Sequence, residues 1–136
     1  MKRLSLWGAI ISLVLLVSCK KNTESVDVCI YGGTSAGVIA AYTASMEGKT
    51  VLLVEPGRHL GGMTSGGLGY TDIGNKFVVT GLTRDFYRRI GSHYGKFEQW
   101  IFEPSVAENI FKDYVERGNV KVLYSHRLNE VKKDGT

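Results

Sequence analysis

Residues 26–62 read VDVCIYGGTSAGVIAAYTASMEGKTVLLVEPGRHLGG, and this stretch decides the fold. It opens on a β-branched apolar run at residues 26–31, which a cluster of glycines follows directly. Residues 35–47 then predict a helix, and residues 50–54 form a second β-branched run that ends at Glu55. The order of strand, glycine turn, helix, strand and acid predicts a βαβ unit of the kind that binds dinucleotides.

The spacing of the glycines matches the chemistry of a diphosphate site. A diphosphate needs backbone N–H groups and the positive end of a helix, and side chains in the turn would hold the backbone away from it. We therefore expect Gly32 to allow the turn and Gly37 to let the helix lie close on the strand. Gly48 is expected to end that helix. One side of the helix is expected to carry the small residues Gly37, Ala40, Ala41 and Ala44.

Glu55 is the predicted ribose-binding residue. It lies 23 residues after Gly32, at the tip of the second strand, where a carboxylate can accept hydrogen bonds from ribose hydroxyls. The same negative charge would repel a 2′-phosphate, so the sequence disfavours a ligand of the NADP type.

Thr34 departs from the usual glycine pattern. In a G-x-G-x-x-G alignment on Gly32 and Gly37, Thr34 occupies the position of the middle glycine. Its Cβ is expected to crowd a diphosphate, while its hydroxyl can donate to a phosphate oxygen. The alternative is an α/β domain whose glycines serve only tight packing, and the complete order of elements favours the dinucleotide site over it.

The N-terminus predicts export. Residues 1–18 begin with the charged pair Lys2 and Arg3 and continue as an apolar run that is too short for a comfortable membrane span. The run ends in Leu-Val-Ser-Cys, which resembles the bacterial lipoprotein signal. That resemblance implies cleavage before Cys19, acylation of Cys19, and anchoring at the bacterial cell envelope, on the periplasmic or outer-membrane side. An ordinary secretory segment or an uncleaved anchor is the alternative.

Charge and cysteine content exclude several classes of protein. The net charge falls from +4 to +2 when residues 1–18 are removed, and the basic residues are scattered, so nothing indicates binding to nucleic acid. Lipidation of Cys19 would leave Cys29 as the second of two cysteines, without a partner for a disulfide or a C-x-x-C motif. Because Cys29 lies in the first apolar run, we expect a buried, inert thiol.

Six glycines fall between Gly57 and Gly69, directly after the predicted ribose-binding acid, and this placement indicates function. Here the motifs IYGGTSAGVIAA, VLLVEP and HLGGMTSGGLGYTD resemble the N-terminus of bacterial FAD-dependent oxidoreductases of the glutathione-reductase-like superfamily. The resemblance is strong over residues 26–72, and it is greatest to a group often exported by polysaccharide-degrading bacteria. It implies a Rossmann-like FAD-binding domain, and Thr34 fits that group's own pattern.

The resemblance also implies which residues bind the cofactor. The glycine turn would hold the FAD diphosphate, Glu55 the adenosine ribose, and the pair Gly61-Gly62 would pass close to the cofactor towards the flavin. Ser65 would lie on the flavin side with its neighbours. The predicted cofactor-binding residues are Gly32, Gly33, Thr34, Ser35, Gly37, Glu55, Arg58, Gly61, Gly62, Met63 and Thr64. No catalytic residue and no metal ligand is predicted, and the redox cysteine pair of the disulfide reductases is absent.

Other polar and aromatic residues have two interpretations each. His59 either links covalently to a flavin or, as a lone histidine usually does, makes hydrogen bonds within its loop. Three arginines between residues 84 and 89 either reach an acidic substrate or the FAD phosphates, or form a solvated helix face, which we prefer. His93, Tyr94 and Trp100 are compatible with a substrate pocket, but their spacing does not require one.

The second half of the chain predicts two helices and further strands. A short helix opening at Leu82 or Thr83 would place Phe86, Tyr87 and Ile90 on one side, and residues 103–117 predict a second helix that Gly118 ends. Its apolar stripe is formed by Val106, Ile110, Phe111, Tyr114 and Val115. Residues 119–124 predict a further parallel strand. Residues 126–133 predict a fourth strand, followed by a hairpin turn at Asp134-Gly135.

Together these observations predict three regions: a signal peptide at residues 1–18, a polar tether at 19–25, and part of an FAD-binding domain at 26–136. The hairpin turn without a second strand predicts a truncated chain with an incomplete sheet, an exposed edge and no turnover of its own. The predicted function is FAD binding within an oxidoreductase that acts on a small molecule, and the group's habitat makes a carbohydrate-derived substrate the first guess. The alternatives are an NAD-dependent dehydrogenase and a non-catalytic lipoprotein, either truncated or a binding module.

Overall fold

The computed structural model describes residues 23–135. Within this part of the chain, three α-helices and three strands are joined by loops that include two short 3-10 turns. In chain order the elements are β1 (Val28–Tyr31), α2 (Ser35–Met46), β2 (Val51–Glu55), η1 (Gly62–Thr64), η2 (Lys76–Val78), α3 (Gly81–His93), α4 (Pro104–Arg117) and β3 (Lys121–Tyr124).

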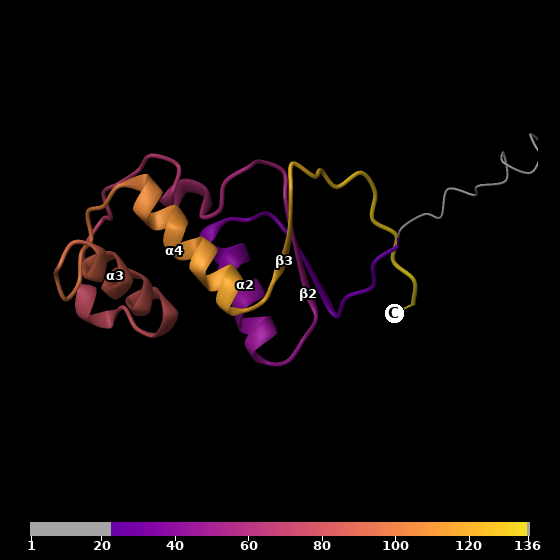
Figure 1. Ribbon diagram of the computed structural model, residues 1–136, viewed down its shortest axis with the longest axis horizontal. Coiled ribbons are helices and arrows are strands. Elements are labelled where there is room, and N and C mark those ends of the chain that lie inside the picture. Colours follow the sequence, from indigo (N-terminus) through magenta and orange to yellow (C-terminus); the bar gives the residue numbers. More distant parts are fainter. Residues whose placement is uncertain (1–22, 136) are drawn as a thin grey trace, which may run out of the picture.

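The strands form one parallel sheet in the order β1-β2-β3. Helix α2 lies against one face of this sheet, α4 packs on α2, and α3 lies beyond them on the same side, as Figure 1 shows. The two crossovers of a parallel sheet require long connections, which α2 and then the α3–α4 pair provide. The structure therefore confirms the predicted α/β class with a Rossmann-like parallel sheet.

The register of β1 on β2 is fixed where both strands begin. Val28 lies opposite Val51, and the residues just before them, Asp27 and Thr50, bond to each other reciprocally. The Asp27 amide donates to the Thr50 hydroxyl at 2.9 Å, and the Thr50 amide donates to the Asp27 carboxylate at 2.8 Å. These side-chain bonds hold the two strands in one alignment, so their far ends arrive at the same edge of the sheet.

The core lies between the sheet and the helices. From the sheet, Leu53 is fully buried and Val28 and Ile30 pack against the cluster. From the helices, Ala41, Phe111 and Tyr114 fill the space, and the Tyr42 and Tyr114 rings meet at 5.1 Å between centroids. The apolar stripe predicted for residues 103–117 faces this core, with Ala107 as a further buried member.

One prediction about burial was wrong. Cys29 is exposed, because alternate residues of a strand point to opposite faces and the helices of the described residues cover one face only. The face of α2 that enters the core carries Val38, Ala41 and Tyr42, while Ala40 is exposed.

Helix boundaries agree with the local signals. Helix α4 begins at Pro104 and ends at the cap residue Gly118, as predicted. The left-handed conformation that follows this helix belongs to Asn119, with φ of 48°, while a Cβ on Gly118 would lie in tight contact with the Tyr42 ring, at 3.2 Å. Helix α3 begins at Gly81, slightly before the predicted Leu82 or Thr83.

The fourth strand predicted at residues 126–133 is absent, while the hairpin turn predicted at Asp134-Gly135 extends outside the described residues and stays a prediction. The segment is exposed irregular chain, and in Figure 1 it runs on the side of the sheet away from the helices. Apolar residues such as Leu128 and Val131 belong to a strand only where a partner strand pairs with their backbone, and the described residues supply none there.

A partly buried polar network joins α3 to α4. The Tyr114 hydroxyl donates to the Asp85 carboxylate at 2.6 Å, and the Arg89 guanidinium bonds to both Asp85 and Asp113. Burial alone would raise the pKa of Asp85, but the bonds from Tyr114 and Arg89 outweigh it and hold that pKa below its ordinary value. Burial and the bond to Asp85 raise the pKa of Tyr114, so its hydroxyl stays protonated as the donor.

The predicted export signal and the predicted lipidation site, Cys19, lie outside the described residues. Among residues 23–135 no helix has the length and apolar character needed to span a bilayer.

We expect Tyr114→Phe to lower the free energy of unfolding by about 1–3 kcal/mol, because it removes a buried donor and leaves Asp85 short of one bond. Urea denaturation followed by circular dichroism measures this loss. Tyr31→Phe is the control, since its side chain is 48% exposed and the change should stay within about 0.5 kcal/mol. Equal effects of the two substitutions would contradict the role assigned to the network.

Candidate functional site

The turn after β1 has a geometry that only glycine satisfies. Gly32 has φ of 105°, and its amide donates to the Val54 carbonyl at 2.8 Å, which ties the turn to β2. A Cβ on Gly37 would lie 2.0 Å from the Gly32 carbonyl oxygen, well inside contact distance. The first turn of α2 therefore lies directly against the end of β1, as the glycine spacing predicts.

Thr34 serves as the N-terminal cap of α2. Its hydroxyl oxygen accepts from the Gly37 amide at 3.1 Å, which satisfies one of the amides that a helix start leaves without a partner. The hydroxyl proton remains available to a ligand oxygen, because the cap uses only a lone pair. The departure from the glycine pattern thus has a local structural cause.

The Gly61-Gly62 segment lies against this turn. The Gly61 amide donates to the Gly33 carbonyl at 2.7 Å, and Gly61 forms an isolated parallel bridge with Thr34. Both glycines have positive φ, of 104° and 55°. A Cβ on Gly61 would lie 2.4 Å from the Phe111 ring, so α4 and the turn leave room for a bare backbone only.

Glu55 connects the turn to the loop after β2. Its carboxylate accepts from the Gly33 amide at 2.6 Å and from the Gly57 amide. A carboxylate has about four acceptor positions, so two bonds to the backbone leave positions for another donor. The carboxylate is thus held at the carboxyl end of β2, beside the glycine turn, where ligands bind in open parallel sheets.

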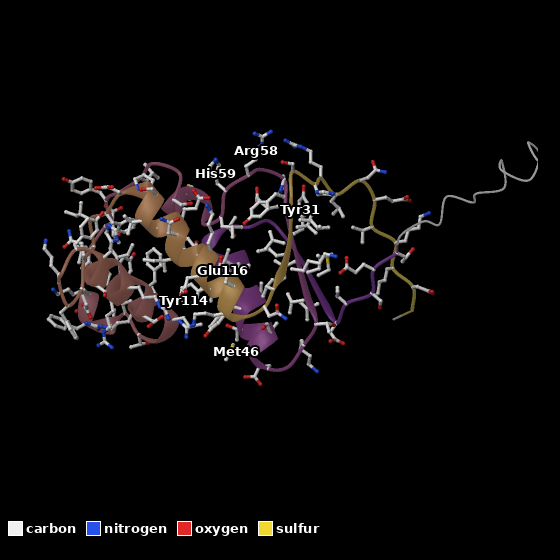
Figure 2. The ribbon with its side chains drawn as sticks, in the orientation of Figure 1. Tyr31, Met46, Arg58, His59, Tyr114 and Glu116 are labelled. Atoms are coloured by element: carbon white, nitrogen blue, oxygen red, sulfur yellow. The ribbon has the colours of Figure 1, made fainter. Side chains whose placement is uncertain are left out.

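A cavity of about 590 Å³ opens next to Glu55, and we call it the polar cavity. Arg58 and His59 line this cavity from the loop after β2. Figure 2 shows the two residues next to each other on that loop. Its lining consists of Glu55, Gly57, Arg58, His59, Gly62, Ser65, Gly66, Gly67, Pro104, Ser105 and Glu108. Three predicted cofactor-binding residues beyond the turn, Glu55, Arg58 and Gly62, therefore share one cavity.

His59 makes a hydrogen bond to α4. Its Nδ1 lies 3.0 Å from the Glu108 carboxylate, which also pairs with Lys112 at 2.8 Å, while the imidazole itself is 77% exposed. Burial alone would raise the pKa of Glu108, but the bonds from Lys112 and His59 lower it. This contact ties the loop after β2 to α4, and the choice between a hydrogen-bonding role and covalent flavin attachment stays a prediction.

A second cavity of about 580 Å³, the apolar cavity, lies on the other side of η1. It is lined by Ser35, Ala36, Ile39, Ala40, Thr64, Leu82, Thr83, Phe86, Tyr87 and Phe111. The sequence predicts Ser35 and Thr64 as cofactor-binding residues, but it does not predict the lining residues that α3 and α4 contribute to this cavity. The amphipathic pattern of α3 was available, yet it does not distinguish a core face from a cavity wall.

The remaining candidates lie elsewhere. Met63 is 79% exposed in η1 and lines neither cavity. Trp100 is buried and stacks on Tyr87 with 3.9 Å between ring centroids. The Tyr94 hydroxyl accepts from the Glu103 amide at 3.0 Å. His93 is exposed and contacts the Tyr94 ring edge-on. None of these residues except Tyr87 borders a cavity described above.

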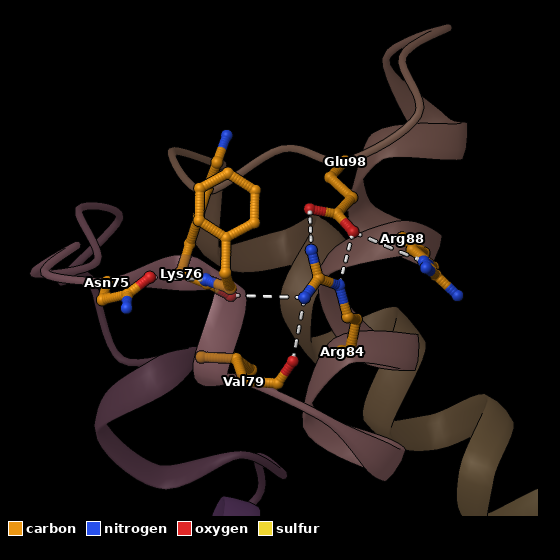
Figure 3. Close-up of polar contacts among 7 residues, drawn as sticks. Asn75, Lys76, Val79, Arg84, Arg88 and Glu98 are labelled. Carbon is orange, nitrogen blue, oxygen red and sulfur yellow. Dashed lines mark hydrogen bonds and ion pairs between the residues drawn. The ribbon is translucent and has the colours of Figure 1, made fainter.

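The arginines of α3 are engaged within the fold. Figure 3 shows the Arg84 guanidinium between the Glu98 carboxylate, at 2.8 Å, and the carbonyls of Lys76 and Val79. Arg88 approaches the same carboxylate at 3.4 Å. These side chains hold the η2 loop and the loop after α3 together, so a purely solvated face does not describe them.

Comparisons with known proteins agree with this geometry. A family model described as FAD dependent oxidoreductase matches residues 27–136. Thiamine thiazole synthase of Pyrococcus horikoshii is 31% identical over 88 residues, which are 64% of this chain and 33% of that protein. Beta-cyclopiazonate dehydrogenase of Aspergillus oryzae is 36% identical over 83 residues, 56% of this chain and 18% of that protein. The chain therefore spans a third or less of these relatives.

The chain is also similar to a solved structure. The crystal structure of THI4 from Thermovibrio ammonificans aligns with a TM-score of 0.49 and 19% identity, over 91% of this chain and 47% of that chain.

We expect Gly37→Ala to lower the free energy of unfolding by about 1–3 kcal/mol, because the new methyl group would overlap the Gly32 carbonyl and push α2 off β1. The midpoint of urea unfolding measures the effect. Gly74→Ala is the matched control, since a Cβ there meets no atom within 4 Å. If Gly37→Ala were as stable as the control, the close approach described here would be wrong.

Proposed function

This chain belongs to the FAD dependent oxidoreductase family, and on that premise we propose that it binds FAD over the glycine turn, Glu55 and the Gly61-Gly62 segment. The observation that carries the proposal is the direct bonding among these three segments. The Gly33 amide reaches Glu55, and the Gly33 carbonyl accepts from Gly61. Segments that are separate in the sequence thus form one continuous surface.

The turn fits a diphosphate. Ser35 and Ala36 lie in the first turn of α2, where a helix leaves its amides without a preceding carbonyl and carries partial positive charge. The absence of a side chain at Gly32, where a Cβ would meet no atom within 4 Å, keeps the backbone open to a ligand, and the Thr34 hydroxyl adds one donor. Backbone amides and a hydroxyl are therefore proposed to hold the diphosphate.

Glu55 is proposed to hold the adenosine ribose. The two backbone amides orient its carboxylate, and its remaining acceptor positions suit the paired hydroxyls of a ribose. A ribose phosphorylated at its 2′ position would bring a second negative charge next to this carboxylate. The site should therefore prefer FAD, or its ADP half, over a 2′-phosphorylated ligand.

The loop that contains Gly61-Gly62, Met63 and Thr64 is proposed to lead towards the flavin, which when bound supplies the acceptor for a hydride or electrons. The chain's own contribution is to bind and orient the cofactor. The substrate is proposed to be a small molecule, and a carbohydrate-derived compound rests on the family resemblance alone. Since the chain spans a third or less of its curated relatives, we propose that residues beyond this chain complete the flavin and substrate sites.

We further propose that the protein is an exported lipoprotein. Support comes from the sequence alone: a short basic start, an apolar run and the Leu-Val-Ser-Cys motif ending at Cys19. Acylation of Cys19, followed by the short tether at residues 20–25, would hold the FAD-binding part close to the envelope membrane.

We expect the chain to bind ADP and FAD, and Glu55→Gln to weaken both about tenfold through loss of charge-assisted bonds to the ribose. Isothermal titration calorimetry measures the affinities. Glu47→Gln, an exposed change at the far end of α2, is the charge-matched control and should leave them unaltered.

The same titrations distinguish a ribose contact from a general charge effect. The wild-type protein should bind ADP more tightly than its 2′-phosphorylated form, and Glu55→Gln should reduce this preference. Failure of the wild-type chain to bind any adenine nucleotide would refute the proposed function. Preference for NAD over FAD would favour the dehydrogenase alternative.

Cys19→Ser is expected to move the protein from the membrane fraction to the soluble or secreted fraction of a bacterial host, because no acyl chain could be attached. Labelling with radioactive palmitate, followed by fractionation, reports both events. Cys29→Ser is the control and should retain label and membrane association. Loss of the label in the control, or its retention in Cys19→Ser, would disprove a lipid anchor at Cys19.

A further inference from the structure

Exposed apolar side chains gather where η2 meets the loop after α3. Phe77 and Val78 lie in η2, Phe97 follows α3, and the exposed fractions of these residues are 76%, 71% and 77%. The η2–α3 patch consists of these three residues and the basic residues beside them, Lys76, Arg88 and Lys96. Apolar side chains that gather on a surface mark a contact site, whereas single exposed ones need no explanation.

Arg84 brings the two parts of the patch together. Its guanidinium donates to the carbonyls of Lys76 and Val79, at 3.3 and 3.0 Å, which flank the apolar residues of η2. It also donates to the Glu98 carboxylate, at 2.8 Å, directly after the third apolar residue. Because one side chain makes all of these bonds, as Figure 3 shows, η2 and the loop after α3 form one continuous surface.

Positive charge accompanies the apolar side chains of the patch. The Lys76 ammonium lies 5.8 Å from the centre of the Phe77 ring, and the Arg88 guanidinium carbon lies 5.0 Å from the centre of the Phe97 ring. Neither Lys76 nor Lys96 pairs with a carboxylate within residues 23–135. The patch therefore combines exposed rings with cations whose charge is not compensated.

We propose that the η2–α3 patch docks on the anionic phospholipid surface of the envelope membrane, an inference that rests on the lipid anchor proposed above. Apolar side chains enter the boundary between headgroups and acyl chains, while lysine and arginine bind lipid phosphates. A protein partner would also cover the rings, but the uncompensated cations complement the continuous negative charge of a membrane.

The place of the patch in the fold suits a protein that is anchored elsewhere. Figure 1 shows α3 towards one end of the longest axis, while the described chain begins on the opposite side of the sheet. An anchor at Cys19 and a contact at the patch would hold the molecule at two separate points, with its long axis along the membrane. The anchor keeps the patch at high effective concentration near lipid, so a weak contact is enough.

Vesicle binding by the unacylated protein tests the patch apart from the anchor. Cys19→Ser protein from the soluble or secreted fraction is mixed with phosphatidylcholine vesicles, with or without about one third phosphatidylglycerol, and the bound fraction is measured by flotation. We expect about fivefold stronger binding to the anionic vesicles at low salt, and weaker binding as salt is added.

Substitutions in the patch should remove this binding. In the Cys19→Ser background, Phe77→Ser with Phe97→Ser is expected to weaken it about fivefold, and Lys76→Gln with Lys96→Gln about threefold. Tyr31→Ser with Met46→Ser is the matched control, because it removes two side chains outside the patch that are 48% and 61% exposed. The control should bind vesicles as the Cys19→Ser protein does. Circular dichroism checks that each variant is folded.

Each other outcome would overturn the proposal. Absence of vesicle binding, equal binding to both kinds of vesicle, or binding that the phenylalanine substitutions leave unchanged would do so, while the palmitate label decides separately on the anchor. Equal loss in the control would indicate a general apolar effect instead of a patch. Self-association in analytical ultracentrifugation that the phenylalanine substitutions abolish, without vesicle binding, would assign the patch to a contact between copies of the chain.

Discussion

The carboxylate of Glu55 holds together the parts on which the candidate site depends. It accepts from one amide in the turn after β1 and from another in the loop after β2, and the same turn accepts a bond from Gly61. Charge-assisted bonds of this kind are stronger than neutral ones. The turn after β1 and the loop after β2, which leave the sheet at its carboxyl edge, are thereby fixed relative to one another before any ligand arrives.

Much of this arrangement follows from local rules. The glycines at positions 32 and 37 are required by the turn after β1 and by the start of α2, which are neighbours in the sequence. The apolar stripe of α4 follows from helical periodicity. The role of Thr34 as a cap is also local, because the bond spans a single helical turn. Sequence reasoning therefore predicts the βαβ unit and brings the turn, Glu55 and the Gly61-Gly62 segment to one place.

What sequence reasoning missed is nonlocal. An apolar run predicts a buried Cys29, yet burial depends on whether later elements cover that face of the sheet. Residues 126–133 have a strand-like pattern, but a strand needs a partner to receive its bonds. The apolar cavity draws its walls from α2, η1, α3 and α4, so no single stretch predicts it. Pairing of the α3 arginines with Glu98 and Asp113 likewise depends on how segments outside that helix pack.

The reciprocal bonds between Asp27 and Thr50 limit how the sequence can change over evolutionary time. They fix the alignment of β1 and β2 where the strands begin, and the glycine turn and Glu55 lie at the other end of these strands. Deleting one residue from β2 alone would send the acid to the opposite surface of the sheet, away from its amide partners. Insertions and deletions should therefore accumulate in the connections before α3 and after β3, while β1 and β2 keep their lengths in step.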